Sequence, residues 1–184
     1  LNGYFQSEKY FKNAEKLVRL DFRFKEHIIE EVEKHYSTYL NEEPVCILVR
    51  DFNPDYDYPN CENNHINIPS KFYEKSIDIL GRDRMYIICS NNIELTKKQK
   101  VFQGDNFIFN EVVPDDIYKG HFDLCLMSMC QDFIISNSTF AWWGAWLGTG
   151  VGKRVLIPTP WYGPGLSHIS TDDLYPDEWE KIEW

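Results

Sequence analysis

Five short apolar runs, most of them rich in β-branched residues, alternate with segments of helical periodicity along most of the chain. Short buried strands that are separated by amphipathic helices predict a parallel sheet with helices on both faces. Because crossovers between parallel strands are right-handed, the pattern favours an α/β fold, a Rossmann-like doubly wound parallel sheet. The expected strands are residues 45–49, 85–89, 106–109, 132–136 and 154–158, and the expected helices are residues 70–80, 94–102, 115–130 and 140–148.

Residues 1–43 follow a different pattern and are expected to form a helical lead-in to the sheet domain, residues 44–184. Residues 1–11 mix aromatic and polar side chains, which indicates a turn before a helix. Residues 22–40 repeat apolar side chains at helical spacing, with charged side chains between them. The break from Asn41 to Pro44 then separates the lead-in from the first expected strand.

The size and charge of the chain limit its class and its partners. A length of 184 residues with 43% hydrophobic and 16% aromatic residues is typical of one packed globular domain. The formal net charge of −10 argues against a nucleic-acid partner, because binding to a phosphate backbone needs a basic surface. A small phosphorylated ligand needs only one or two well-placed donors and is compatible with this charge.

The cysteine and histidine patterns argue against a disulfide framework and against a metal site. The five cysteines are scattered, form no CxxC pair and lie mostly in or beside apolar runs, so we expect reduced, buried thiols. The five histidines form no HxxxH or HExxH arrangement, and a solvated side chain is the default for each. No apolar stretch reaches the length of a membrane span, and no signal-peptide pattern is present. As given, the chain is expected to be cytoplasmic, or membrane-associated if an upstream segment is missing.

Three polar groups of residues follow expected strands at the point where each strand ends. They are Arg50-Asp51, Ser90-Asn91-Asn92 and Asn137-Ser138-Thr139. Ligands of open α/β sheets bind outside the carboxyl ends of the strands, so we expect these groups to meet at one crevice. Their separation in the sequence strengthens this expectation, because a chance alignment at one sheet edge is rare.

Ser138 and Thr139 lie where a strand is expected to turn into a helix. Unpaired backbone N–H groups and the positive end of the helix dipole make such a turn a favourable site for a phosphate. An ordinary helix N-cap is the alternative, because serine and threonine are preferred there for structural reasons alone. For the three tryptophans that follow, at Trp142, Trp143 and Trp146, core packing is the favoured interpretation of at least two.

Two charged residues are candidate ligands for a nucleoside diphosphate. Arg50 directly follows a strand, and its planar guanidinium suits a diphosphate better than a lysine would. A surface ion pair with Asp51 is the alternative. Asp123 lies on a largely apolar expected helix, where it either has a structural role or accepts hydrogen bonds from N–H groups of a ligand. Guanine offers two adjacent donors of that kind.

The stretch FDLCLMSMCQDFIISNSTFAWWGAWL, residues 122–147, resembles the signature of the GDP-fucose-dependent alpha-1,2-fucosyltransferases, glycosyltransferase family 11. In that family an Asp-Leu-x-Leu-Met-Ser-x-Cys segment leads into Asn-Ser-Ser/Thr-Phe-Ser-Trp-Trp-Gly-Ala-Trp-Leu. The stretches GYFQSEKYF, VLIPTPWYG and DLYPDEW are similar to further family segments, in the expected order. The resemblance therefore covers nearly the whole chain.

This resemblance implies a GT-B enzyme, of which residues 44–184 would be the donor-binding half and residues 1–43 a remnant of the acceptor-side half. The implied reaction is an inverting transfer of fucose from GDP-fucose to a sugar hydroxyl, typically the 2-OH of galactose. It needs neither a metal nor a cofactor. The implied partners are the nucleotide sugar and a glycan acceptor.

Position by position, the resemblance assigns roles to residues of the expected crevice. Arg50 matches the arginine that holds the diphosphate, and Asp123 matches the carboxylate that reads the guanine. Ser138, Thr139 and Phe140 match the turn that contacts the phosphate. The predicted substrate-binding residues are Asp123, Asn137, Ser138, Thr139, Phe140, Ser90 and Asn91.

The sequence departs from the family pattern where a catalytic base is expected. The family's His-x-Arg-Arg-Gly-Asp-Tyr corresponds here to LVRDFNP, residues 48–54, which keeps only the first arginine. Asp-Tyr pairs follow at Asp55 and Asp57, so these two residues are the first candidates for the base, with Asp51 third. The family's Ser-Asp-Asp corresponds to Ser90-Asn91-Asn92, which keeps hydrogen bonding but loses charge.

The Gly-rich segment and the acceptor-side half with which a family member begins do not occur in these residues. Either the chain is a fragment, or a partner supplies that half, or the protein binds a GDP-sugar without efficient transfer. Two functions therefore stand beside the fucosyltransferase: a non-catalytic GDP-sugar binding module, and a structural interaction domain that binds no nucleotide.

Overall fold

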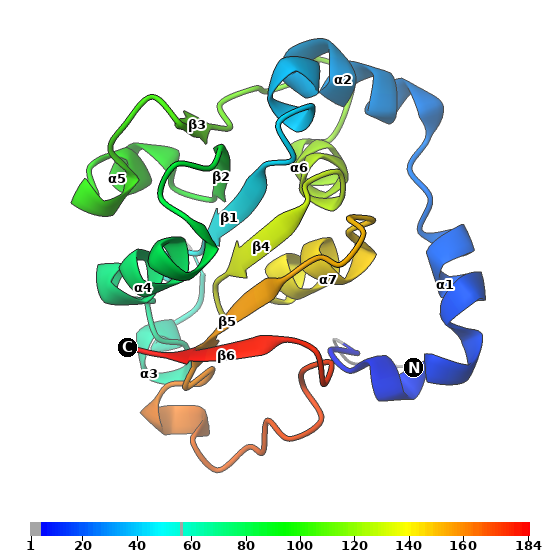
Figure 1. Ribbon diagram of the computed structural model, residues 1–184. Helices are drawn as coiled ribbons and strands as arrows, with labels where there is room; N and C mark the ends of the chain where they lie inside the picture. Colours follow the sequence, from blue (N-terminus) through cyan, green and yellow to red (C-terminus); the bar gives the residue numbers. More distant parts are fainter. Residues whose placement is uncertain (1–4, 56) are drawn as a thin grey trace.

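The computed structural model describes residues 5–55 and 57–184, and these residues form a six-stranded parallel sheet (Figure 1). The strands are β1 (Val45–Val49), β2 (Tyr86–Ser90), β3 (Phe107–Phe109), β4 (Asp132–Ile135), β5 (Val155–Thr159) and β6 (Glu180–Glu183). Their order is β3-β2-β1-β4-β5-β6, and all neighbours are parallel. This is the strand order of the Rossmann fold, so the predicted α/β architecture is confirmed.

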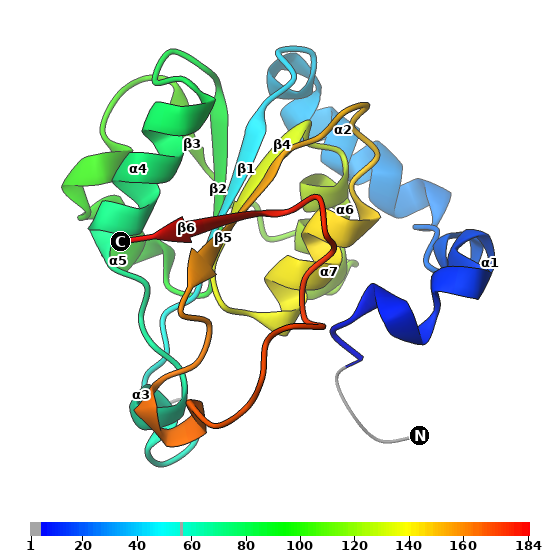
Figure 2. The ribbon, with the colours of Figure 1, turned by 60° about the horizontal axis from the view of Figure 1, so that its bottom comes forward.

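Helices cover both faces of the sheet, and each face has its own apolar core (Figure 2). The α-helices of the described chain are α1 (Glu15–Asp21), α2 (Glu26–Leu40), α3 (Cys61–Asn64), α4 (Ser70–Leu80), α5 (Ile93–Lys97), α6 (Lys119–Ser128) and α7 (Thr139–Leu147). α4 shares one core with Val45, Ile47 and Val49 of β1. α2, α6 and α7 share the other core with Cys46 and Leu48. Alternate residues of β1 are thus buried on opposite faces, which is why this strand is apolar throughout.

The observed elements differ from the predicted ones at the edges of the domain. The helix expected over residues 22–40 begins only at Glu26, because Phe22 stacks on Trp143 and turns the chain after the separate helix α1. The helix expected over residues 94–102 divides into α5 and a short 3-10 helix, η3 (Lys100–Phe102). The sequence pattern does not predict β6, because EKIE is a half-exposed edge strand without a continuous apolar run.

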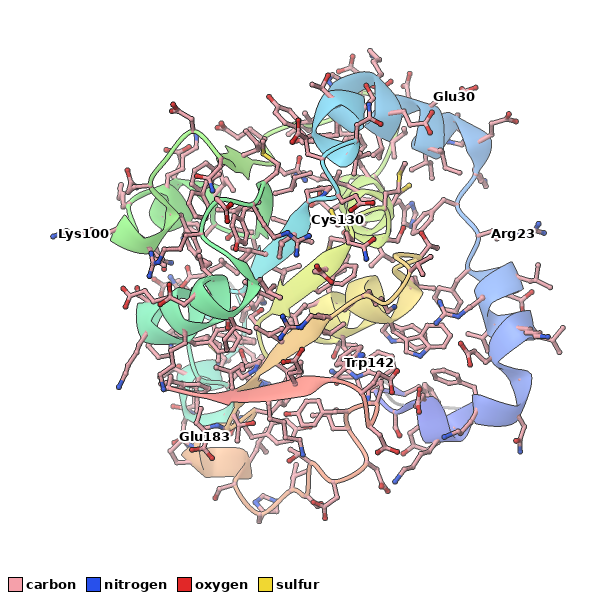
Figure 3. The ribbon with its side chains drawn as sticks, in the orientation of Figure 1. Arg23, Glu30, Lys100, Cys130, Trp142 and Glu183 are labelled. Carbon is pink, nitrogen blue, oxygen red and sulfur yellow. The ribbon has the colours of Figure 1, made fainter. Side chains whose placement is uncertain are left out.

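The tryptophans of α7 anchor this helix in the larger core. Trp142 is fully buried, and its indole N–H donates to the carbonyl oxygen of Leu174 at 2.8 Å. Trp146 is also buried, whereas Trp143 is partly exposed. Figure 3 shows Trp142 in the interior, while Arg23 extends outward from the rim of the molecule. The expectation that at least two of the three tryptophans pack in the core is therefore confirmed.

The expected state of the cysteines is confirmed as well. All five thiols are free and buried, and Cys130 is labelled in the interior in Figure 3. Among the described residues, no helix is both long enough and apolar enough to cross a membrane.

β1 and β4 are neighbours at the centre of the sheet, but the chain leaves them toward opposite faces. After β1 it runs through α3 to α4, which packs in one core, and after β4 it runs to α7, which packs in the other. Such a switch in direction opens a crevice beside the two strand ends. Below these ends, α3 lies beside the 3-10 helix η4 (Pro164–Leu166), which is orange in Figure 2. The crevice is therefore bounded by the loops that follow β1, β4 and β5.

Candidate functional site

The residues that join β4 to α7, which we call the α7 turn (residues 136–140), form one wall of the crevice. Ser138 is the N-cap of α7, and its Oγ accepts a hydrogen bond from the Ala141 N–H at 3.5 Å. A serine hydroxyl also has its own proton and a second lone pair, so Ser138 keeps capacity for another partner. Within the described chain, the N–H groups of Thr139 and Phe140 have no hydrogen-bond partner, as usual in a first helical turn. The turn therefore presents donors at the positive end of the helix dipole.

Asn137 fastens the α7 turn to two other segments. The residue is 2% exposed, and its Nδ2 donates to the carbonyl oxygens of Ile66 at 3.0 Å and Trp161 at 2.9 Å. Its Oδ1 is buried without a hydrogen-bond partner among the residues that the structure describes. The amide N–H groups of Asn137 thus fix the shape of the crevice.

Arg50 is the first residue after β1 and begins a long loop, the β1 loop (residues 50–67). Its guanidinium lies over the Phe52 ring, with 4.8 Å between Cζ and the ring centroid, and forms an ion pair with Asp57. Its Nη1 donates to the carbonyl oxygen of Asp51 at 3.0 Å. The ion-pair partner is therefore Asp57, not the Asp51 carboxylate that the sequence offered as the alternative.

Hydrogen bonds join the start of the β1 loop to the residues after β2. The Asn91 side chain donates to the Asp51 carbonyl oxygen at 2.9 Å and accepts from the Asp51 N–H at 2.8 Å. Asn92 Nδ2 donates to the Asp51 carboxylate at 2.9 Å. The Ser90 hydroxyl accepts from the Asn92 N–H at 3.0 Å and from the Thr96 hydroxyl at 2.9 Å. Two predicted substrate-binding residues, Ser90 and Asn91, thus also support the crevice.

Two cavities open at this edge of the sheet and share one wall. The Asp123 cavity has a volume of about 200 Å³, and Asp123, Ser90 and Asn91 line it. The aromatic cavity has a volume of about 540 Å³, and Asn137 and Thr139 line it together with aromatic side chains. The residues that line both cavities are Arg50, Ser138 and Phe140. Eight of the ten predicted site residues therefore meet here, although they come from four separate stretches of sequence.

Asp123 provides an acceptor inside the smaller cavity. Its Oδ1 accepts hydrogen bonds from Asn110 Nδ2 at 2.7 Å and from Lys119 Nζ at 2.8 Å. Asn110 is itself held by the Tyr36 hydroxyl, which donates to its Oδ1 at 2.8 Å. Burial raises the pKa of Asp123 above its ordinary value, against the opposing effects of Lys119 and Asn110. Because both bonds go to Oδ1, Oδ2 is left as an acceptor for a ligand.

The two carboxylates that the sequence predicts as the base lie outside the linings of both cavities. Asp57 binds Arg50 through Oδ1, and its Oδ2 accepts from the Asn53 N–H at 3.0 Å. Asp55 is exposed. A catalytic role for either residue stays a prediction. In residues 5–55 and 57–184, no group of three or more His, Cys, Asp or Glu side chains lies close enough together to hold a metal ion.

The sequence pattern does not indicate the aromatic wall of the larger cavity. Phe52, Tyr58 and His65 come from the β1 loop, and Trp161 and Tyr162 follow β5. They share no spacing or motif, and only the fold brings them together. The one available signal is the density of aromatic residues in both loops, which is also typical of ordinary surface packing.

Comparison with known proteins places the chain in a family. The family model for glycosyl transferase family 11 matches residues 1–183, so the chain belongs to that family. The O-antigen biosynthesis glycosyltransferase WbnK of Escherichia coli is 31% identical over 119 residues, which are 62% of this chain and 38% of WbnK. An alpha-1,2-colitosyltransferase of Escherichia coli is 32% identical over 119 residues, 61% of this chain and 39% of that enzyme.

The fold also matches a solved structure from a different glycosyltransferase family. The glycosyl transferase family 9 protein from Veillonella parvula aligns with a TM-score of 0.51 at 14% identity, over 88% of this chain and 42% of that chain. This likeness concerns the fold alone. In each case the matched region is about two fifths of the length of the known protein.

Proposed function

We propose that the chain is the donor-binding half of an inverting fucosyltransferase, which moves fucose from GDP-fucose to a sugar hydroxyl such as the galactose 2-OH. Membership of glycosyl transferase family 11 supports glycosyl transfer. The nature of the nucleotide, of the transferred sugar and of the accepting hydroxyl is our inference from the site.

The observation that carries this proposal is the wall shared by the two cavities. Arg50 and the start of α7 are the groups that suit a diphosphate, and they lie between the smaller and the larger space. A diphosphate on this wall would direct its nucleoside into the Asp123 cavity and its sugar into the aromatic cavity. Asp123 Oδ2 would then accept from the N–H groups of guanine, which uracil and adenine do not present in the same arrangement.

The same wall supplies the electrostatics that the reaction needs. As the glycosidic bond breaks, negative charge grows on the departing diphosphate. The Arg50 guanidinium and the N–H groups of Thr139 and Phe140 are preorganised donors that would stabilise this charge. Asp57 and Phe52 hold the guanidinium in position before the ligand arrives, which lowers the cost of ordering it.

A binding site for the acceptor glycan is not part of this proposal for residues 44–184. The chain spans about two fifths of the length of the curated relatives that it matches. We infer that residues 44–184 form the donor domain, and that another half, from the same protein or from a partner, binds the glycan. One relative is named a colitosyltransferase, so the test of the donor must include sugars other than fucose.

A nucleotide panel tests the proposal directly. GDP at a hundredfold excess over its Kd should stabilise the chain by about 2.7 kcal/mol, which raises Tm by roughly 5–10 °C. UDP and ADP should give a much smaller rise. Arg50→Ala should weaken GDP binding by about ten- to hundredfold, because it removes charge-assisted hydrogen bonds of about 1.5–3 kcal/mol.

Arg82→Ala is the matched control. Arg82 is exposed and pairs with Asp78 on α4, far from the carboxyl edge, so its loss should leave the response to GDP unchanged. A chain whose Tm responds to no guanine nucleotide would contradict the proposal.

A second function is favoured by one observation. Asn91 and Asn92 use their amides to hold Asp51, where the family pattern has carboxylates, and this suits a GDP-sugar binding module without turnover. Such a module would respond to GDP in the same way but would release no GDP from GDP-fucose in the presence of galactosides. Measured turnover would exclude it.

A further inference from the structure

The wall of the aromatic cavity contains one side chain that can exchange a proton near neutral pH. Its lining has the permanently charged Arg50, the phenols Tyr58 and Tyr162, and the imidazole of His65, but no carboxylate among the residues that the structure describes. Tyrosine ordinarily titrates near pH 10 and arginine far above that, so neither provides a base at about pH 7. His65 is the residue with suitable chemistry.

The backbone around His65 is fixed by three different segments. The Asn67 side chain forms two hydrogen bonds with the Phe52 backbone. Its Oδ1 accepts from the Phe52 N–H at 2.7 Å, and its Nδ2 donates to the Phe52 carbonyl oxygen at 3.0 Å. Asn137 of the α7 turn donates to the Ile66 carbonyl oxygen. The Gly163 N–H donates to the Asn64 carbonyl oxygen at 2.8 Å. Residues on both sides of His65 are therefore tied to the elements that form the crevice.

The imidazole itself is stacked beside the arginine of the shared wall. The rings of His65 and Phe52 are 4.7 Å apart and within 14° of parallel, and the Arg50 guanidinium also lies over the Phe52 ring. The rings of Tyr58 and Tyr162 also lie close to the imidazole, each with 6.2 Å between ring centroids. Within the described chain, His65 Nδ1 is buried and has no hydrogen-bond partner. No described side chain therefore competes for a proton on this nitrogen.

Burial and the neighbouring Arg50 charge favour the neutral form of His65. Burial lowers the pKa of His65 and the Arg50 charge lowers it further, while Asp57 acts in the opposite direction. An imidazole with a pKa below its ordinary value of about 6.5 is mostly unprotonated at pH 7. It can then accept a proton without first losing one.

We propose that His65 is the catalytic base of the transfer, and that its imidazole takes the proton of the acceptor hydroxyl inside the aromatic cavity. This inference rests on the proposed function. It replaces Asp55 and Asp57 in that role, because Asp55 is exposed and both oxygens of Asp57 have partners on the protein.

The transfer step conserves atoms and electrons without any further reactant. The acceptor oxygen forms a bond to the anomeric carbon, and the bond from that carbon to the diphosphate oxygen breaks. The electron pair of the broken bond leaves with GDP, and the acceptor proton passes to a ring nitrogen of His65. The imidazolium returns this proton to water after the products leave.

The first test measures the pKa of His65 by NMR on the ¹⁵N-histidine-labelled chain. Binding of GDP brings negative charge to the wall next to the imidazole, so it should raise the pKa of His65 by about half a unit or more. His27, an exposed residue of α2 on the far side of the larger core, is the internal control and should not respond. A pKa of His65 that is unchanged by bound GDP would overturn the proposal.

The second test measures turnover on the natural full-length protein. His65→Gln should lower kcat by about 10²-fold or more, the usual contribution of a general base, while the Kd of GDP changes by no more than about threefold. It should also remove the acidic limb of the pH dependence of kcat. A kcat within about threefold of wild type, or an acidic limb that disappears in Asp57→Asn instead, would overturn the role of His65.

Failure of this inference can be told apart from failure of the proposed function. If GDP does not bind, the proposed donor site is contradicted, and so is the role of His65. If GDP binds and the wild-type protein has no turnover, His65 has no catalytic role, but the nucleotide site stands. His65 is the base if three conditions hold together: GDP binds, the wild-type protein has turnover, and both tests give the expected result.

Discussion

The α7 turn and the β1 loop face the same crevice, but they reach it in different ways. The α7 turn links a buried strand to a buried helix in a few residues, and its donors follow from the helix start itself. The β1 loop is long and polar, and its path is held by the side chains of Asn91 and Asn137 from other segments and by Asn67 within the loop. One crevice can therefore combine a wall formed by local geometry with a wall formed by long-range hydrogen bonds.

A substitution in the core beneath the α7 turn should cause the largest loss of stability. Trp142→Ala removes a fully buried indole and its bond to the Leu174 carbonyl oxygen, so we expect a loss of about 3–5 kcal/mol in the free energy of unfolding. Trp143→Ala, on the same helix but partly exposed, should lose less than half as much. Urea unfolding of both variants measures the difference. Equal losses would show that the turn does not depend on the buried face of α7.

Removing the hydrogen bonds by which Asn137 joins the α7 turn to the β1 loop should cause the next largest loss of stability. Asn137→Ala leaves the carbonyl oxygens of Ile66 and Trp161 without their donor, at a cost of roughly 2–3 kcal/mol. Asn137→Asp keeps the shape of the side chain but replaces the donating amide with an acceptor, so it should be at least as destabilising. An Asn137→Asp variant that melts like the wild type would contradict the assigned hydrogen bonds.

The β1 loop alone should respond to a smaller change. Asn67→Ala removes two hydrogen bonds to the Phe52 backbone, and we expect a loss of about 1–2 kcal/mol. Amide hydrogen exchange should show faster exchange at Phe52, with no change at Trp142, whose N–H belongs to α7. Faster exchange at both sites would mean that the two walls open together, and the contrast between them would be lost.

Asp123→Asn should have the smallest effect on stability and a selective effect on binding. Because burial raises the folded-state pKa of Asp123, the folded chain holds more protons than the unfolded chain just above the ordinary aspartate pKa. Stability therefore falls as the pH rises through that window. The reason is that a buried carboxylate loses hydration when it ionises. The uncharged amide that Asp123→Asn introduces would not ionise, so it avoids this desolvation cost.

The same substitution separates stability from recognition. We expect Tm at pH 7 to be equal or higher in Asp123→Asn, and the Kd of GDP to rise by about tenfold, because the carboxylate acceptor is lost. As the pH falls toward the raised pKa of Asp123, wild-type binding should weaken and approach that of the variant. Calorimetric titration between about pH 5 and pH 8 checks this prediction, and parallel curves for the two proteins would contradict it.

Much of the fold is predictable because its signals are local. Continuous apolar runs mark β1, β2 and β4 as strands buried on both faces, and the polar residues at their ends predict the crevice. β6 escapes such prediction, because this edge strand, EKIE, is half exposed and contains a single apolar residue, so it shows neither an apolar run nor an apolar/polar alternation. The break between α1 and α2 escapes it too, because the packing of Phe22 on Trp143 is a tertiary contact.

The candidate site also has a part that local sequence predicts and a part that depends on tertiary contacts. A strand followed by Ser138 and Thr139 at a helix start is sufficient to predict donors for a phosphate, since neighbours in the chain create them. The partner of Arg50 is different. Asp51 and Asp57 are equally available in the sequence, and only the path of the β1 loop selects Asp57.

The sequence by itself determined the parallel sheet, the helix start after β4 and the position of Arg50, because each depends on contacts between near neighbours or on strand periodicity. The tertiary structure alone decided that His65 enters the aromatic cavity and that Asp57 turns away from it. The reason is that loop paths are chosen by hydrogen bonds and packing between distant segments, such as Asn137 with Ile66 and Trp161, and no local pattern encodes those partners.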